Sequence, residues 1–183
     1  MGIPLREQHD EGDIGMTQAY QAMCFAKEKH KFHKRKYTGN PYSEHLAEVA
    51  GIVATVCHHD ISISVAWLHD VIEDQGVTHE ELVELFGVAV ADGVTWLTDT
   101  EEGTRATRKK LSCERLSNAP AWIQTIKVAD LISNTSSIVQ HDPKFATTYL
   151  AEKRQLLSVL KKANPLLLEI AWKQTEAVSK DNI

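Results

Sequence analysis

An apolar segment, residues 61–73, constrains the fold of this chain more than any other feature. Its residues are apolar on nearly every side of a helix, which predicts a short helix in the middle of a core. Four polar side chains nevertheless fall at its end: His69, Asp70, Glu73 and Asp74. On one continuous helix they would form two adjacent stripes, and burying three carboxylates without partners is very unfavourable. Since the nearest Lys or Arg is more than thirty positions away in either direction, a metal ion is favoured over carboxylates that other donors satisfy at a helix end.

Helical spacing of apolar residues recurs along nearly the whole chain, and no segment shows the alternation that is typical of strands. We therefore expect an all-α fold, a single compact bundle of about 8–10 helices, over residues 15–183. Residues 1–14 are polar and contain glycine, which predicts a flexible arm. The helices are expected at about residues 17–34, 43–56, 61–73, 78–86, 88–97, 105–117 and 120–139, and from Pro143 and Pro165 onward.

Charge is unevenly distributed along the chain. No Lys or Arg stands from Tyr37 through Thr104, but this stretch holds thirteen carboxylates. Basic clusters flank it at residues 27–36 and 105–115. An acidic segment between two basic clusters suits the binding of a divalent cation beside a polyphosphate. Most of these charges equally fit helix faces that are exposed to solvent. The net charge of −5 argues against general binding of duplex DNA, which needs an extended basic surface.

Two further polar groups interrupt predicted helices. Asp130 lies on an otherwise apolar helix, with Asn134 one turn later and Ser137 three residues beyond. His45 lies in the first turn of its helix, after the predicted turn at residues 37–42. Together with the His-Asp pair above, these residues give a pattern His…His-Asp…Asp. The first His precedes the pair by 24 residues and the last Asp follows it by 60.

This pattern resembles the HD superfamily of metal-dependent phosphohydrolases. The surrounding sequence narrows the resemblance: RKYTGNPYSEH at 35–45, LHDVIED at 68–74, VTWLT at 94–98 and KVADLISN at 127–134 are similar to the hydrolase domain of the RelA/SpoT alarmone enzymes. Because no synthetase domain is present in this sequence, the chain resembles the free-standing small alarmone hydrolases, including the metazoan Mesh1 type. The resemblance covers roughly residues 17–160.

The resemblance implies which residues carry the chemistry. His45, His69, Asp70 and Asp130 would hold one divalent metal, and mixed nitrogen and oxygen ligands suit Mn²⁺. Glu73 and Asp74 would be the catalytic acidic pair, one acting on the attacking water and the other assisting. The sequence leaves open which residue takes which role.

The resemblance also implies where the nucleotide binds. Arg35 and Lys36 would face the nucleotide, Asn134 would hold the ribose–phosphate region, and Ser137 would approach the base. The second basic cluster supplies looser candidates for phosphate contacts: Arg105, Lys109 and Arg115. Leu131 stands where the long enzymes have Arg, and the stretch after Asn134 also departs from their pattern, so the sequence does not fix guanine as the base.

The function that follows is removal of the 3′-diphosphate from a purine alarmone, (p)ppGpp or ppApp, by a Mn²⁺-dependent phosphohydrolase. Three alternatives stay open: a 2′-phosphatase of NADPH, a non-hydrolytic nucleotide sensor, and an HD phosphodiesterase acting on nucleic acid. Three widely spaced cysteines without a CxxC pair fit a reducing cytoplasm. We expect no membrane span and no nucleic-acid partner. Apolar residues of the last helix could form a homodimer or pack in the core: Leu166, Leu167, Ile170 and Trp172.

Overall fold

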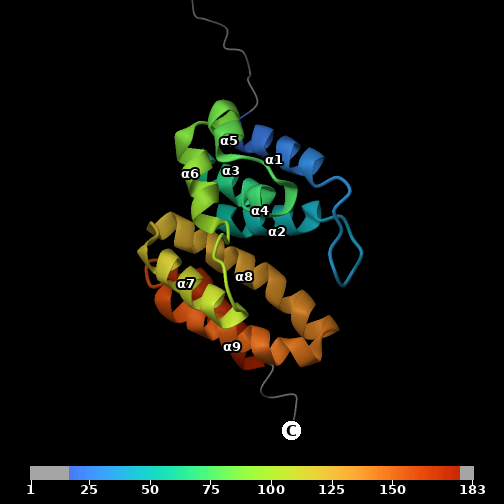
Figure 1. The fold of residues 1–183 in the computed structure, drawn as a ribbon, viewed down its shortest axis with the longest axis vertical. Helices are drawn as coiled ribbons and strands as arrows, with labels where there is room; N and C mark the ends of the chain where they lie inside the picture. Colours follow the sequence, from blue (N-terminus) through green and yellow to red (C-terminus); the bar gives the residue numbers. More distant parts are fainter. Residues whose placement is uncertain (1–16, 178–183) are drawn as a thin grey trace, which may run out of the picture.

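The computed structural model describes residues 17–177, and this part of the chain is helical with no strand (Figure 1). Its ten helices confirm the predicted all-α fold. In chain order they are α1 (Gln18–Lys29), α2 (Ser43–Ala54), α3 (Asp60–Leu68), α4 (Val71–Gln75), α5 (His79–Phe86), α6 (Val88–Leu97), α7 (Arg105–Asn118), α8 (Ala121–His141), α9 (Pro143–Val159) and α10 (Pro165–Ala177). The arm predicted at residues 1–14 lies outside the described residues.

The long helix α8 separates two groups of helices. Helices α1 to α6 pack together on one side, and α7, α9 and α10 pack on the other (Figure 1). Helix α8 contacts α2, α3 and α6 in the first group and α9 and α10 in the second. A residue on α8 can therefore complete a site whose other members come from either group.

Local sequence signals explain several helix ends. The Thr78 hydroxyl accepts a hydrogen bond from the Glu81 N–H at 3.1 Å, and Gly87, with φ of 81°, ends α5. Asp142 caps α9 directly before a proline, and the Asn164 side chain accepts from two N–H groups of α10. These ends lie where the sequence predicted them.

The first predicted helix was too long, and its neighbour begins differently. Helix α1 ends at Lys29, not near Lys34, because residues 30–42 form a loop with its own hydrogen bonds. The Arg35 N–H donates to the Asn40 carbonyl at 2.8 Å, and the Tyr42 N–H donates to the His33 carbonyl at 3.0 Å. Ser43 does not cap α2: it is the helix's first residue and its side chain makes no cap bond.

The predicted helix at 61–73 is also wrong, because the chain breaks at His69 and Asp70. Helix α3 ends at Leu68, and α4 begins at Val71. The His69 imidazole donates to the Ala66 carbonyl at 2.8 Å, and the Asp70 backbone adopts φ of −105° and ψ of 0°. The two stripes expected on one helix therefore do not exist, and the break lets two consecutive side chains point to one place.

The core explains the apolar residues of the last helix in part. Leu167 is buried and Trp172 packs against the core, whereas Leu166 and Ile170 are exposed. The packing of α6 is tight: a Cβ at Gly93 would lie 2.7 Å from the Trp122 ring and 2.8 Å from Val65. Within residues 17–177, no helix combines the length and the apolar character that crossing a membrane requires.

Candidate active site

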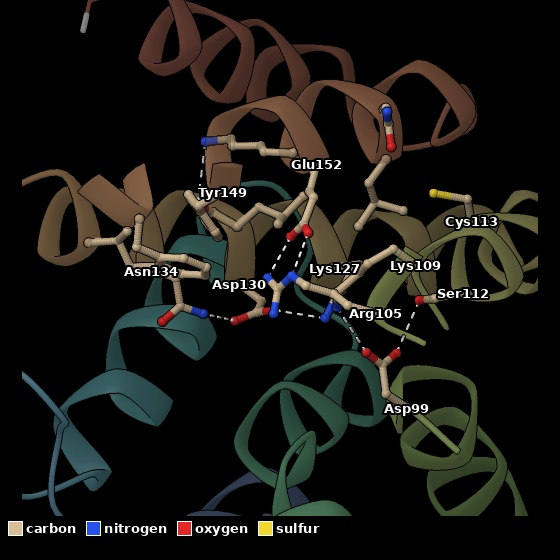
Figure 2. Close-up of a pocket in the computed structure, with 16 residues that line it drawn as sticks. Asp99, Arg105, Lys109, Ser112, Cys113, Lys127, Asp130, Asn134, Tyr149 and Glu152 are labelled. Carbon is tan, nitrogen blue, oxygen red and sulfur yellow. Dashed lines mark hydrogen bonds and ion pairs between the residues drawn. The ribbon is translucent and has the colours of Figure 1, made fainter. Parts of the chain in front are cut away.

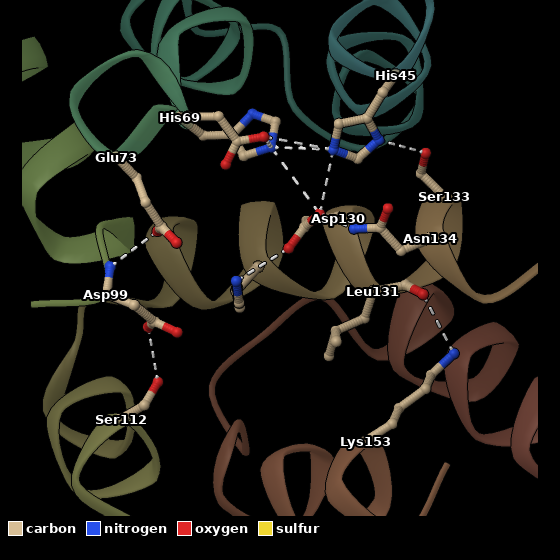
Figure 3. Close-up of polar contacts among 12 residues, drawn as sticks. His45, His69, Glu73, Asp99, Ser112, Asp130, Leu131, Ser133, Asn134 and Lys153 are labelled. Atoms are coloured by element: carbon tan, nitrogen blue, oxygen red, sulfur yellow. Dashed lines mark hydrogen bonds and ion pairs between the residues drawn. The ribbon is translucent and has the colours of Figure 1, made fainter. Parts of the chain in front are cut away.

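The structure brings together the four residues predicted as metal ligands. His45 comes from α2, His69 and Asp70 from the break between α3 and α4, and Asp130 from α8 (Figure 3). His45 Nε2 lies 3.3 Å from His69 Nε2, 3.3 Å from Asp130 Oδ1 and 3.6 Å from Asp70 Oδ2. His69 Nε2 lies 3.0 Å from Asp70 Oδ2 and 3.9 Å from Asp130 Oδ1. Two imidazole nitrogens and two carboxylates thus face one another, although 60 residues separate the two aspartates.

Hydrogen bonds on the far side of each imidazole fix its orientation. His69 Nδ1–H donates to the Ala66 carbonyl at 2.8 Å. The Ser133 hydroxyl donates to Glu48 Oε2 at 2.7 Å, so its oxygen accepts from His45 Nδ1–H at 2.8 Å. In the neutral form of each ring the proton therefore sits on Nδ1 and an Nε2 lone pair faces the cluster, which is the tautomer that a metal-binding histidine needs. Sequence reasoning missed Ser133, whose one signal is a small polar residue three positions after Asp130.

The electrostatics of the cluster favour a positive charge at its centre. Burial lowers the pKa of His69, but Asp70 and Asp130 outweigh it and raise that pKa to about 9. Burial would raise the pKa of Asp70, but His69 and His45 hold it well below its usual range. Both carboxylates are therefore ionised at neutral pH and attract either protons on the histidines or a cation between them.

Other side chains donate hydrogen bonds to the two aspartates, and the sequence did not predict these contacts. Lys127 Nζ lies 2.9 Å from Asp130 Oδ2, and Asn134 donates to Asp130 Oδ1 at 2.6 Å. The Tyr42 hydroxyl donates to Asp70 Oδ2 at 2.7 Å. The distance along the sequence to the nearest basic residue was therefore a poor guide, because α8 brings Lys127 to the site.

The donor set fits a divalent metal. Ligand atoms about 2.1 Å from one ion lie about 3.0–3.4 Å from each other in octahedral or tetrahedral geometry, and the five distances that involve a histidine nitrogen, 3.0–3.9 Å, lie close to this range. Lys127 binds Oδ2 of Asp130 and leaves Oδ1 facing His45. One neutral nitrogen from each histidine and one oxygen from each aspartate are thus available to one ion.

The predicted acidic pair is divided between two environments. Glu73 Oε2 accepts from the Asp99 N–H at 3.2 Å and lies on the side of α7 (Figure 3). Asp74 instead lies 3.8 Å from His33 Nδ1. Burial raises the pKa of both carboxyls above the usual value. A raised pKa suits a carboxyl that accepts or donates a proton near neutral pH.

A pocket of about 360 Å³ adjoins the cluster and shares Asp130 with it (Figure 2). Helices α7, α8 and α9 form its walls, and its volume is in the range of small-molecule sites. Arg105, the first residue of α7, pairs across the pocket with Glu152 of α9 at 2.6 Å. Lys109 lies 3.4 Å from Asp99. Two of the three predicted phosphate contacts from the second basic cluster, Arg105 and Lys109, therefore line this pocket.

The remaining predicted nucleotide contacts gather in an adjoining hollow of about 220 Å³, lined by Arg35, Lys36, Asn134 and Ser137. The Arg35 guanidinium donates to Asn134 Oδ1 at 3.2 Å, and Asn134 also lines the larger pocket. Arg115 does not join these residues, because its guanidinium is bound to Asp99, Glu101 and the Trp96 carbonyl.

Comparison with known proteins decides the family. The sequence profile of the HD domain family matches residues 22–165. The chain belongs to the HD domain family. This confirms the resemblance drawn from the motifs and agrees with the divalent-metal site described above.

Individual HD domain relatives are similar over most of the chain. Zebrafish (Danio rerio) MESH1, named guanosine-3′,5′-bis(diphosphate) 3′-pyrophosphohydrolase, is 32% identical over 128 residues, which cover 68% of this chain and 71% of the relative. The GTP pyrophosphokinase rsh of Brucella melitensis is 29% identical over 147 residues, or 76% of this chain and 20% of the relative. The chain thus spans about a fifth of the length of the first curated relatives that it matches.

A solved structure shares the fold. A metazoan ortholog of SpoT, described as hydrolysing ppGpp, aligns with a TM-score of 0.82 over 91% of this chain and 98% of its own, at 22% identity. This HD domain therefore has the arrangement of helices seen in that protein.

Proposed function

We propose that this protein is a metal-dependent pyrophosphohydrolase that removes the 3′-diphosphate from a purine alarmone, (p)ppGpp or ppApp. One observation carries the proposal: Asp130 belongs both to the four-residue cluster and to the wall of a pocket of nucleotide size. A phosphate bound beside Asp130 would meet the cluster directly. The names of the relatives described above supply the substrate class.

The charges in the pocket suit a polyphosphate. Arg105 makes a two-bond pair with Glu152, and Lys109 lies 3.4 Å from Asp99 in a partly exposed pair that contributes little stability. A diphosphate would replace Asp99 as the partner of Lys109 at small cost and would compete with Glu152 for Arg105. Arg presents a planar fork of donors to phosphate oxygens, and Lys acts as a point charge.

We propose Mn²⁺ as the metal, held by His45, His69, Asp70 and Asp130. The mixed nitrogen and oxygen donor set supports this choice. Such an ion would supply Lewis acidity to a phosphoryl oxygen and lower the pKa of water.

Two carboxyls would handle the protons. Glu73 lies on the pocket side, beside Asp99, and would take the proton of the attacking water at one of its carboxylate oxygens. As the water oxygen bonds to phosphorus, the bond from phosphorus to the ribose 3′-oxygen would break, and Asp74, on the side of His33, would give that oxygen a proton. The raised pKa of each carboxyl supports proton transfer near neutral pH.

The nucleoside end would lie in the smaller hollow. Arg35 would contact phosphate or stack on the base, Lys36 would add positive charge, and Asn134 would hold the ribose. Ser137, one turn beyond Asn134 on α8, would approach the base. Guanine and adenine differ in their donor and acceptor groups, so this region would set the preference between ppGpp and ppApp.

The deciding experiment is a panel of ppGpp, pppGpp, ppApp, NADPH and GTP with EDTA-stripped protein, before and after addition of Mn²⁺. Products are resolved by ion-exchange chromatography. Mn²⁺-dependent release of pyrophosphate from one alarmone is the expected result and also fixes the base. Release of phosphate from NADPH alone, or nucleotide binding without turnover while metal is bound, would overturn the proposal.

We propose that the enzyme works in the reducing cytoplasm, because its three cysteines are free thiols.

We also propose that the protein forms a homodimer through one face of α10. Leu166 and Ile170 form an exposed apolar pair on this face.

A further inference from the structure

A second cluster of histidine and carboxylate groups lies beside Tyr42. His30 and His33 follow the end of α1, and Asp74 lies on α4. The two Nδ1 atoms are 3.0 Å apart, and His33 Nδ1 is 3.8 Å from Asp74 Oδ2. The donor atoms of all three residues lie within 4.8 Å of one another. None of the roles assigned above uses either histidine.

The His30 ring is buried and presents one nitrogen, Nδ1, to the cluster. The side chain is only 1% exposed, and its Nε2, which is not the atom that faces His33, has no hydrogen-bond partner within the described chain. All polar contacts of the ring are made through Nδ1, on the side of His33 and Gln75.

The surroundings hold the two histidines in place and leave the cluster accessible. The Tyr42 ring stacks on His33 and His30 at centroid distances of 3.9 and 5.0 Å. The His33 N–H donates to the His30 carbonyl at 2.9 Å. The side chains of His33 and Asp74 are each 32% exposed, so an ion can enter from solvent.

We propose that His30, His33 and Asp74 form a second metal site, for a zinc-type divalent transition metal ion. Zinc binds imidazole nitrogens at about 2.0–2.1 Å, so two such ligands lie about 3.3–3.4 Å apart in tetrahedral geometry, and the Nδ1 atoms here, 3.0 Å apart, need separate by only about 0.3 Å. The Gln75 amide lies 3.4 Å from His30 Nδ1 and can turn its oxygen toward the same ion. Only Asp74 must move closer, and its exposed side chain can do so.

Zinc stoichiometry tests this site without any substrate. The full chain is stripped with EDTA and titrated with Zn²⁺ in competition with a chromophoric chelator. His33→Gln should lose one zinc per chain relative to the wild type, or bind it at least about tenfold more weakly. His79→Gln is the matched control, because His79 is a partly exposed histidine that pairs with Asp92 on other helices. It should bind as the wild type does.

Further variants separate the two sites. Asp130→Ala should lose the zinc ion at the cluster of His45, His69, Asp70 and Asp130. It should keep the zinc ion that His33→Gln removes. If circular dichroism shows that His33→Gln is unfolded, Asp74→Asn tests the same site and should lose the same zinc. Equal zinc number and affinity in the wild type and in a folded His33→Gln or Asp74→Asn would overturn the proposal.

A consequence for activity rests on the proposed function. Zinc that binds Asp74 would remove this carboxylate from proton transfer. Zinc added to the Mn²⁺-loaded wild type should therefore inhibit turnover, and His33→Gln should need at least about tenfold more zinc for the same inhibition. The binding titration stands apart from this assay, so absence of turnover would contradict the proposed function and leave the zinc count as the test of the site.

Discussion

Ser133 offers a quantitative test of how His45, a predicted metal ligand, is held. Its hydroxyl joins His45 Nδ1 to Glu48, and both Ser133 and His45 are only 1% exposed. Ser133→Ala removes the acceptor and leaves a buried N–H without a partner. Glu48 is exposed and regains water. The lost interaction is therefore that of one buried donor, about 1–3 kcal/mol.

This energy should appear mainly as weaker metal binding. Without Ser133, His45 can place its hydrogen on Nε2, and this tautomer must be reversed before the nitrogen binds an ion. Because about 1.4 kcal/mol corresponds to a tenfold change, we expect Ser133→Ala to raise the metal Kd by about 10- to 100-fold. The measurement is Mn²⁺ titration of EDTA-stripped protein in competition with a chelator.

A matched variant isolates the cause. Ser136 lies on the same helix, is exposed, and donates only to the Ser133 carbonyl at 3.4 Å. Ser136→Ala should bind Mn²⁺ as the wild type does. Wild-type affinity in a folded Ser133→Ala would refute the claim that this hydroxyl orients His45.

Four further outcomes follow from the structure. Asp130→Ala should lose metal and activity together, and full metal content by elemental analysis would remove Asp130 from the ligand set. Glu73→Gln should retain the metal and nearly abolish turnover; a near wild-type rate would exclude its catalytic role. Burial lowers the pKa of Lys153 to about 7, against about 10.4 in the unfolded chain, so the unfolded state binds more protons between these values. Stability should therefore rise from pH 7 to 9, by about 2 kcal/mol relative to Lys153→Met in denaturant titrations; parallel pH profiles would contradict this. Gly93→Ala should destabilise the fold by about 1–3 kcal/mol, because the new Cβ overlaps Trp122 and Val65, and an unchanged denaturation midpoint would show that the helices can separate freely.

The sequence predicts those parts of the fold that depend on neighbouring residues. Thr78, Gly87 and Asn164 act within one turn of the chain, and the helices that they bound lie where expected. The end of α1 was missed because it depends on hydrogen bonds within the loop of residues 30–42, including the one from Arg35 to Asn40. No local pattern encodes these contacts.

The candidate site, like the fold, depends partly on local sequence and partly on tertiary packing. The motifs predicted four metal ligands, because their types and spacing carry a family pattern, and the structure places these four residues together. The break at His69 and Asp70 was not visible, since apolar residues continue through it. Lys127 and Ser133 were also missed, because their roles depend on which face of α8 meets α2 and α3. Tertiary packing decides these contacts.

Because α8 lies between two groups of helices, the four-residue cluster and the larger pocket are built mostly from different helices. His45, His69 and Asp70 come from the first group, whereas the outer walls of the larger pocket come from α7 and α9 in the second. Among the described helices, α8 alone contributes to both the cluster and the pocket, through Asp130. In the proposed function, substitutions in α7 and α9 would change which molecule binds while the four predicted metal ligands keep their positions. Such a scaffold would let new substrates evolve, or be designed, around chemistry that remains constant.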